Sequence, residues 1–134
     1  MSKILIVDDE PAQRLLLRRI FERAGHEVAD AGNGADALQA VGESRPDLVV
    51  TDMMMPVMNG AELIRRLRRE PATADIAILA ASGDPHLAEG ADAVISKPFV
   101  SRHLVEVADA LLKDASPGDA WSKDAWSKDE GGLR

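Results

Sequence analysis

The sequence contains no cysteine, which excludes disulfide bonds, thiolate metal sites and cysteine nucleophiles. Aromatic residues make up only 3% of its 134 residues, so the core must be built from aliphatic side chains and methionine. No apolar run approaches the length of a membrane span, and the N-terminus has no signal-peptide pattern. We therefore expect a cytoplasmic protein of a single main domain without a membrane partner.

The net charge is −7, which argues against nucleic acid as a partner because such binding depends on neutralising phosphates with Lys and Arg. Two predicted helices nevertheless carry arginine clusters, namely Arg14, Arg18, Arg19 and Arg23, and Arg65, Arg66, Arg68 and Arg69. We interpret both clusters as solvated helix faces, with the docking of an acidic protein as the functional alternative.

Short, continuous apolar runs are typical of strands that are covered on both faces of a sheet. Such runs occupy residues 4–7, 48–51, 76–81 and 93–95, and a weaker one lies at 26–29. Helical patterns lie between or after them, at residues 11–24, 34–41, 61–69 and 101–113. Alternation of strands and helices predicts a doubly wound, parallel α/β sheet in a domain of residues 1–113.

One connection is unusually short. Only ten residues, from Ser82 to Ala91, separate the fourth predicted strand from the fifth. A parallel crossover that contains a helix needs at least ~10–12 residues, so this connection holds one or two helical turns at most. The fourth helix is therefore expected to be shortened or absent.

Polar side chains follow the predicted strands where each strand ends: Asp8 and Asp9, Asp52, Ser82, and Lys97. The carboxyl ends of parallel strands meet at one crevice, so these groups should converge. Three carboxylates repel one another and favour a hard cation such as Mg2+, which takes oxygen ligands. Aspartate can form an acyl phosphate, which makes Asp52 a candidate nucleophile, and Lys97 can balance phosphoryl charge. This pattern predicts a site for phosphoryl transfer.

Four motifs make a specific set: residues 6–10 (IVDDE), 51–60 (TDMMMPVMNG), 81–83 (ASG) and 96–99 (SKPF). With them the chain resembles the receiver domains of bacterial two-component response regulators, over residues 3 to about 113. The resemblance implies a flavodoxin-like, five-stranded parallel sheet of order 2-1-3-4-5. It also implies that a histidine kinase or histidine phosphotransfer protein phosphorylates Asp52, and that the chain catalyses only its own phosphorylation and dephosphorylation.

The same resemblance assigns roles within the site. It implies that Asp9 and Asp52 ligate Mg2+ directly, that Asp8 helps through water, and that the Met54 main-chain carbonyl completes the protein ligands. Ser82 would be the switch hydroxyl and Lys97 the cation that senses the phosphoryl group. A cis peptide bond is expected between Lys97 and Pro98.

Two features depart from the family pattern. The aromatic switch residue three positions before the lysine is replaced by Val94, and the fourth helix is largely missing. Met54 and Asp84 occupy positions where the family tunes the lifetime of the phosphoryl group. Asp84 can orient an attacking water molecule or simply lie in a turn.

The sequence leaves three hypotheses for the function of this chain. The first is a stand-alone receiver that acts through an unidentified downstream protein, without an attached output domain. The second is a receiver-like binding module that is insensitive to phosphorylation, which Val94 and the short crossover favour. The third, a Mg2+-dependent aspartyl phosphatase, is disfavoured because such enzymes usually place their nucleophile in an Asp-x-Asp pair after the first strand.

The last segment, residues 114–134, differs in composition from the rest. The sequence Asp-Ala-Trp-Ser-Lys occurs at residues 119–123 and again at 124–128, and holds both tryptophans of the protein. Its composition is typical of a polar, flexible tail. The alternative is a binding motif or a segment that docks on the domain, because tryptophan is enriched at binding hot spots.

Overall fold

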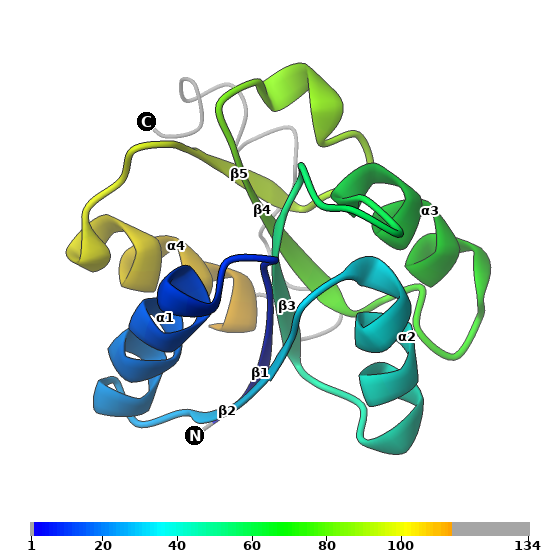
Figure 1. Cartoon of the computed structure of the whole chain (residues 1–134). Coiled ribbons are helices and arrows are strands. Elements are labelled where there is room, and N and C mark those ends of the chain that lie inside the picture. Colours follow the sequence, from blue (N-terminus) through cyan, green and yellow to red (C-terminus); the bar gives the residue numbers. More distant parts are fainter. Residues whose placement is uncertain (1, 114–134) are drawn as a thin grey trace.

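Five parallel strands form the centre of the protein in the computed structural model, which describes residues 2–113 (Figure 1). They are β1 (Lys3–Val7), β2 (Glu27–Ala31), β3 (Leu48–Asp52), β4 (Ala77–Ser82) and β5 (Ala93–Ser96). Their order in the sheet is β2-β1-β3-β4-β5, and every neighbouring pair is parallel. This is the flavodoxin-like doubly wound order, so the predicted fold is confirmed.

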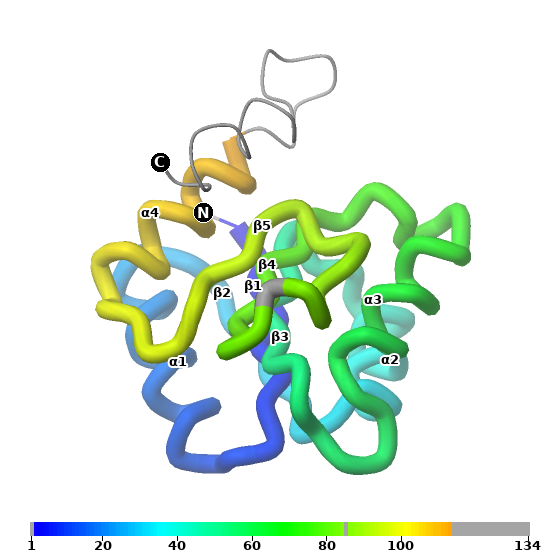
Figure 2. Tube along the Cα trace, turned by 90° about the horizontal axis from the view of Figure 1, so that it is seen from above, coloured from blue at the N-terminus to red at the C-terminus, as the bar shows by residue number. Residues whose placement is uncertain are grey.

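Two helices cover each face of the sheet. Helices α1 (Pro11–Arg23) and α4 (Ser101–Lys113) lie on one face, and α2 (Gly34–Glu43) and α3 (Gly60–Arg69) lie on the other (Figures 1 and 2). Among the described residues, no helix has both the length and the apolar character needed to cross a membrane. The predicted tail, residues 114–134, lies outside the described residues.

Strand β1 shows why its apolar run is continuous. Ile4 and Ile6 pack in the core cluster under α1 and α4, whereas Leu5 and Val7 pack in the cluster under α2 and α3. All four side chains are at most 2% exposed. Successive side chains of a strand point to opposite faces, so a strand covered on both faces must be apolar at every position.

The helix ends follow local sequence signals. The side chains of Asn33 and Asn59 accept hydrogen bonds from the main-chain amides of Asp36 and Glu62, and so cap α2 and α3. Gly25, with φ of 96°, follows the end of α1, as the predicted glycine stop requires. Helix α2 runs two residues further than predicted, to Glu43, because a single glycine in a last turn weakens a helix without ending it.

The connection from β4 to β5 holds one short 3-10 turn, η1 (Pro85–Leu87), which confirms that no full helix fits there. Arg68 of α3 fastens this connection. Its guanidinium donates to the main-chain carbonyls of Ala74, Ile76 and Gly90 at 2.7, 2.7 and 3.0 Å, and to the Asp92 carboxylate at 2.7 Å. The sequence pattern predicts that Arg68 lies on a solvated helix face, and this prediction is wrong: Arg68 is a half-buried clamp between α3 and the crossover.

Candidate functional site

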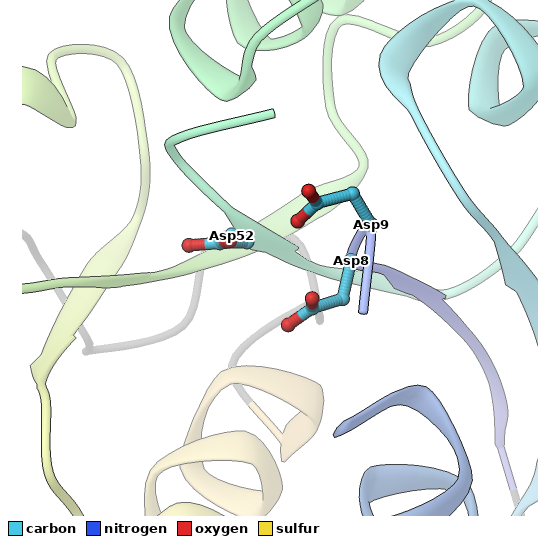
Figure 3. A group of neighbouring side chains, drawn as sticks. All are labelled: Asp8, Asp9 and Asp52. Carbon is cyan, nitrogen blue, oxygen red and sulfur yellow. The ribbon is translucent and has the colours of Figure 1, made fainter. Parts of the chain in front are cut away.

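The carboxyl ends of two neighbouring strands, β1 and β3, bring the predicted acidic residues together. Asp8 and Asp9 follow β1, and Asp52 is the last residue of the neighbouring strand β3. Figure 3 shows the three side chains grouped at this edge, and one carboxylate oxygen of each lies within 4.8 Å of the others. The predicted convergence is therefore observed in the structure.

Asp8 is the most buried member of this cluster, with 4% of its surface exposed. Its carboxylate accepts a hydrogen bond from the Glu10 amide at 2.9 Å. Burial raises the pKa of the Asp8 carboxyl, and the neighbouring carboxylates of Asp52 and Asp9 act in the same direction, against the lowering effects of the Glu10 amide and Lys97. Without a cation, the charged form of Asp8 is therefore unfavourable in this cluster.

Asp52 is held by two hydrogen bonds. The ammonium of Lys97, which follows β5, donates to Asp52 Oδ1 at 2.9 Å, and the Met53 amide donates to the same oxygen at 2.8 Å. Among the described residues, both hydrogen bonds to this carboxylate therefore go to Oδ1. The Asp52 side chain is 11% exposed and that of Lys97 is 36% exposed, so a reactant can approach.

A depression of about 520 Å3 opens over this pair and gives a reactant room. Asp8, Asp52, Lys97, Gln13 and Phe99 are among the residues that line it. The peptide bond between Lys97 and Pro98 is cis, as expected from the sequence.

The donor set fits a hard divalent cation. Three carboxylates can each offer an oxygen to one point, and burial raises the pKa of the most buried one, Asp8. A bound cation would stabilise the charged forms, and Mg2+ takes carboxylate and water oxygens as ligands. The side chain of Met54 is 71% exposed, and the role of its carbonyl as a ligand stays a prediction.

Ser82 lies at the same edge, because it ends β4 and is 3% exposed. Its hydroxyl donates to the Asp84 carbonyl at 2.9 Å and accepts from the Asp84 amide at 2.9 Å. Asp84 thus lies in the turn that follows the strand. The hydroxyl has a single proton, so it can donate to a group on Asp52 only after giving up its hydrogen bond to the Asp84 carbonyl.

The loop from β3 to α3 approaches the site closely at Gly60. Its amide donates to the Met53 carbonyl at 3.1 Å, and a Cβ atom at this position would lie 2.4 Å from the Asp52 carbonyl oxygen. Only glycine fits there. Val57, in the same loop, has a φ of 69°, a left-handed conformation that is strained for a β-branched residue.

Arg14 belongs to the site, although the sequence pattern predicts a solvated arginine at this position. It is half-buried, and its guanidinium donates to the Asp8 main-chain carbonyl at 2.8 Å. The only available signal was its position, one helical turn after the Asp8-Asp9-Glu10 run. A guanidinium at that position stabilises the turn that presents the two carboxylates.

The family described as the response regulator receiver domain matches residues 4–109. Among curated relatives, the phosphate regulon transcriptional regulatory protein PhoB of Pseudomonas aeruginosa is 41% identical, over 87% of this chain and 54% of the relative. Sporulation initiation phosphotransferase F of Bacillus subtilis is 36% identical, over 84% of this chain and 92% of the relative. The chain thus spans about half the length of several of the curated relatives that it matches, which are transcriptional or DNA-binding regulators.

Solved structures that resemble this chain include receiver domains and response regulators. The receiver domain of a signal transduction histidine kinase from Syntrophus aciditrophicus superposes with a TM-score of 0.82 at 31% identity, covering 91% of this chain and 98% of that one. The chemotaxis response regulator CheY4 of Vibrio cholerae gives a TM-score of 0.78 at 29% identity, covering 83% and 98%.

Proposed function

The chain belongs to the response regulator receiver family, and on that basis we propose that it is a phosphoryl-accepting switch, phosphorylated on Asp52 in the presence of Mg2+. The observation that carries this proposal is the Asp8, Asp9 and Asp52 cluster with Lys97 paired to Asp52 at 2.9 Å. Receiver domains are signalling switches rather than classical enzymes. We further propose a cytoplasmic location and a histidine kinase or histidine phosphotransfer protein as the phosphoryl donor.

The two oxygens of Asp52 have different roles in this proposal. Oδ1 is engaged by Lys97 and the Met53 amide, which leaves Oδ2 as the nucleophile. Oδ2 attacks the phosphorus of a phosphohistidine, an O–P bond forms, and the N–P bond breaks. The departing imidazole keeps the electron pair of that bond and takes a proton from solvent. Both oxygens of the carboxylate are then in use, one covalently and one by hydrogen bonds.

Mg2+ is held in this proposal by the carboxylates of Asp9 and Asp52, with Asp8 contributing through water and Met54 through its carbonyl. The chemistry that the ion supplies at such a site is neutralisation of negative charge on the transferring phosphoryl group. Asp8, already tied to the Glu10 amide, keeps its carboxylate oriented toward the other two.

Lys97 and Ser82 respond to the new phosphoryl group. The Lys97 ammonium can shift from Asp52 Oδ1 to a phosphoryl oxygen, because both lie within reach of one flexible side chain. The Ser82 hydroxyl can donate to another phosphoryl oxygen only by leaving the Asp84 carbonyl.

That exchange suggests how the signal leaves the site. The Asp84 carbonyl also accepts the Leu87 amide at 3.1 Å, and the Asp84 carboxylate accepts the His86 amide at 3.0 Å, so Asp84 anchors η1. Val94 has an aliphatic, half-buried side chain on β5 instead of an aromatic one. We therefore assign the readout to η1, which would move when Ser82 releases Asp84.

The switch acts, in our proposal, by protein–protein contacts with a downstream protein, without nucleic acid and without an output domain. Sporulation initiation phosphotransferase F, which the chain covers over 92% of its length, supports this more than the longer transcriptional regulators do. Immunoblotting of the native protein tests it: a band at the mass of 14.4 kDa is expected. A band about twice that size would contradict the stand-alone proposal.

Intact-mass spectrometry tests the chemistry. The protein is incubated with acetyl phosphate and Mg2+, and we expect a gain of one phosphoryl group that Asp52→Asn abolishes. Lys97→Ala should permit the modification but remove its structural consequences, read as amide shifts of η1. Asp109→Asn, on the exposed side of α4, is the matched control and should leave the mass gain unchanged. A wild-type chain without any Asp52-dependent gain would refute the proposal.

The second candidate is a receiver-like binding module that is insensitive to phosphorylation. Val94 and the single turn at η1 favour it, because both depart from the usual readout. It predicts that the mass gain occurs without any change in the amide spectrum beyond the immediate surroundings of Asp52. Shifts that reach His86 and Leu87 would exclude it.

A further inference from the structure

A groove of about 660 Å3 lies where the short crossover passes α3. Ala61, Arg65 and Arg69 of α3 line one wall, and His86, Leu87 and Glu89 of the crossover line the other. Arg68 and Gly90 also line the groove, and the Arg68 guanidinium donates to the Gly90 carbonyl at 3.0 Å. This is a preformed feature, distinct from the phosphoryl-transfer site.

The groove is locally basic on a chain whose net charge is −7. Arg68 is matched by Asp92, and Arg65 and Arg66 share the single carboxylate of Glu62. These pairs leave positive charge at Arg65, whose side chain is 66% exposed, and at the exposed Arg69. An occupant that matches this wall carries carboxylates.

The opposite wall is partly apolar. Leu87 is 42% exposed, although leucine side chains are usually buried. Glu89, on the same wall, contributes a negative charge. A matching occupant therefore combines carboxylates, a large apolar side chain and a cation within a few residues.

The Asp-Ala-Trp-Ser-Lys repeat of this chain, residues 119–128, carries this combination twice. We propose that the repeat binds the α3/η1 groove of its own chain, with tryptophan against Leu87 and aspartate against Arg65 and Arg69. Tryptophan and arginine are the residues most enriched at binding hot spots. This inference goes beyond the proposed function and does not depend on phosphorylation.

The chain is long enough for this contact. Thirteen residues lead from Lys113, the end of α4, to Trp126, and they extend to at most about 45 Å. A domain of this size has a diameter of about 35 Å. Because the chain must follow the surface, and half the circumference of such a domain is about 55 Å, Trp126 reaches the groove of its own copy by a route shorter than half-way round the domain.

Tryptophan fluorescence of the full chain tests the proposal, because Trp121 and Trp126 are its only tryptophans. The reference is a synthetic peptide of residues 119–128. We expect a roughly twofold lower acrylamide quenching constant in the full chain, since one of the two indoles is shielded. The double variant Arg65→Glu/Arg69→Glu should restore the peptide value, and high salt should weaken the shielding. Arg23→Glu, at the exposed end of α1, is the matched control and should change nothing.

A second measurement reads the groove itself and keeps the test independent of how the arginine variants fold. Amide NMR spectra of the full chain are compared with those of Trp121→Ala/Trp126→Ala, and the differences should fall on Ala61, Arg65 and Leu87. Equal quenching in chain and peptide, an equal effect of Arg23→Glu, or spectral differences confined to other surfaces would overturn the proposal. Shielding that rises with protein concentration would also overturn it, because it indicates contact between two copies.

Discussion

The Arg68 clamp allows a stability change to be worked out from the structure. In Arg68→Met the aliphatic stem stays, whereas four hydrogen bonds, three to main-chain carbonyls and one to Asp92, are lost. Each contributes a net ~0.5–1.5 kcal/mol, so the sum is about 2–6 kcal/mol. The side chain is 24% exposed, and water can replace part of the loss. We therefore expect the free energy of unfolding to fall by about 3 kcal/mol.

Urea unfolding followed by far-UV circular dichroism measures this change. With a slope of about 1.5 kcal/mol per molar urea, the midpoint should fall by about 2 M while the slope stays constant. Arg66→Met is the matched control, because Arg66 lies on the same helix but only pairs with Glu62 at the surface, and it should cost less than about 1 kcal/mol. If both variants unfold at the same urea concentration, Arg68 does not fasten the crossover.

The remaining predictions use the same urea assay. At ten times its dissociation constant, Mg2+ should raise the free energy of unfolding by about 1.4 kcal/mol, and Asp9→Asn should reduce that gain at equal Mg2+; no gain in the wild type would contradict the cation site. Without Mg2+, Asp8→Asn should stabilise the protein at neutral pH, because the raised pKa of Asp8 means that the folded state disfavours its charged form. That advantage should vanish as the pH falls below the ordinary value of 3.8, where the carboxyl is protonated in both states, so a gain that persists there would have another cause. Val57→Asn should add about 1 kcal/mol, because asparagine tolerates the left-handed conformation better than valine, and a loss of stability would show that the loop needs the valine side chain.

Several features of the fold could be predicted because they depend on short-range patterns. The apolar runs at residues 4–7 and 48–51 predict central strands, because only a strand covered on both faces of the sheet buries every side chain of such a run. The ten residues from Ser82 to Ala91 were too few for a full helix. Asp8, Asp52 and Lys97 were expected to meet because each follows a strand, and parallel strands end at one edge. These conclusions need only chain geometry and residue type.

The half-buried positions of Arg14 and Arg68 could not be predicted in this way. Arg14 and Arg68 look like their exposed neighbours on the same helices, and each finds main-chain carbonyls that lie distant in sequence or on another element. The direction of the Ser82 hydroxyl, toward Asp84 instead of the carboxylates, is likewise a matter of the turn that the chain makes after β4.

The sequence by itself determined the order of strands and helices, the acidic cluster with its lysine, and the absence of a full helix before β5. These follow from side-chain periodicity, chain length and the rule that parallel strands share an edge. Only the tertiary structure decided that Arg68 holds the short crossover by hydrogen bonds to Gly90 and Asp92. It also decided that a basic groove lies beside the crossover. Both depend on which carbonyls and charges the folded chain places within hydrogen-bonding distance, and residue type alone does not encode that distance.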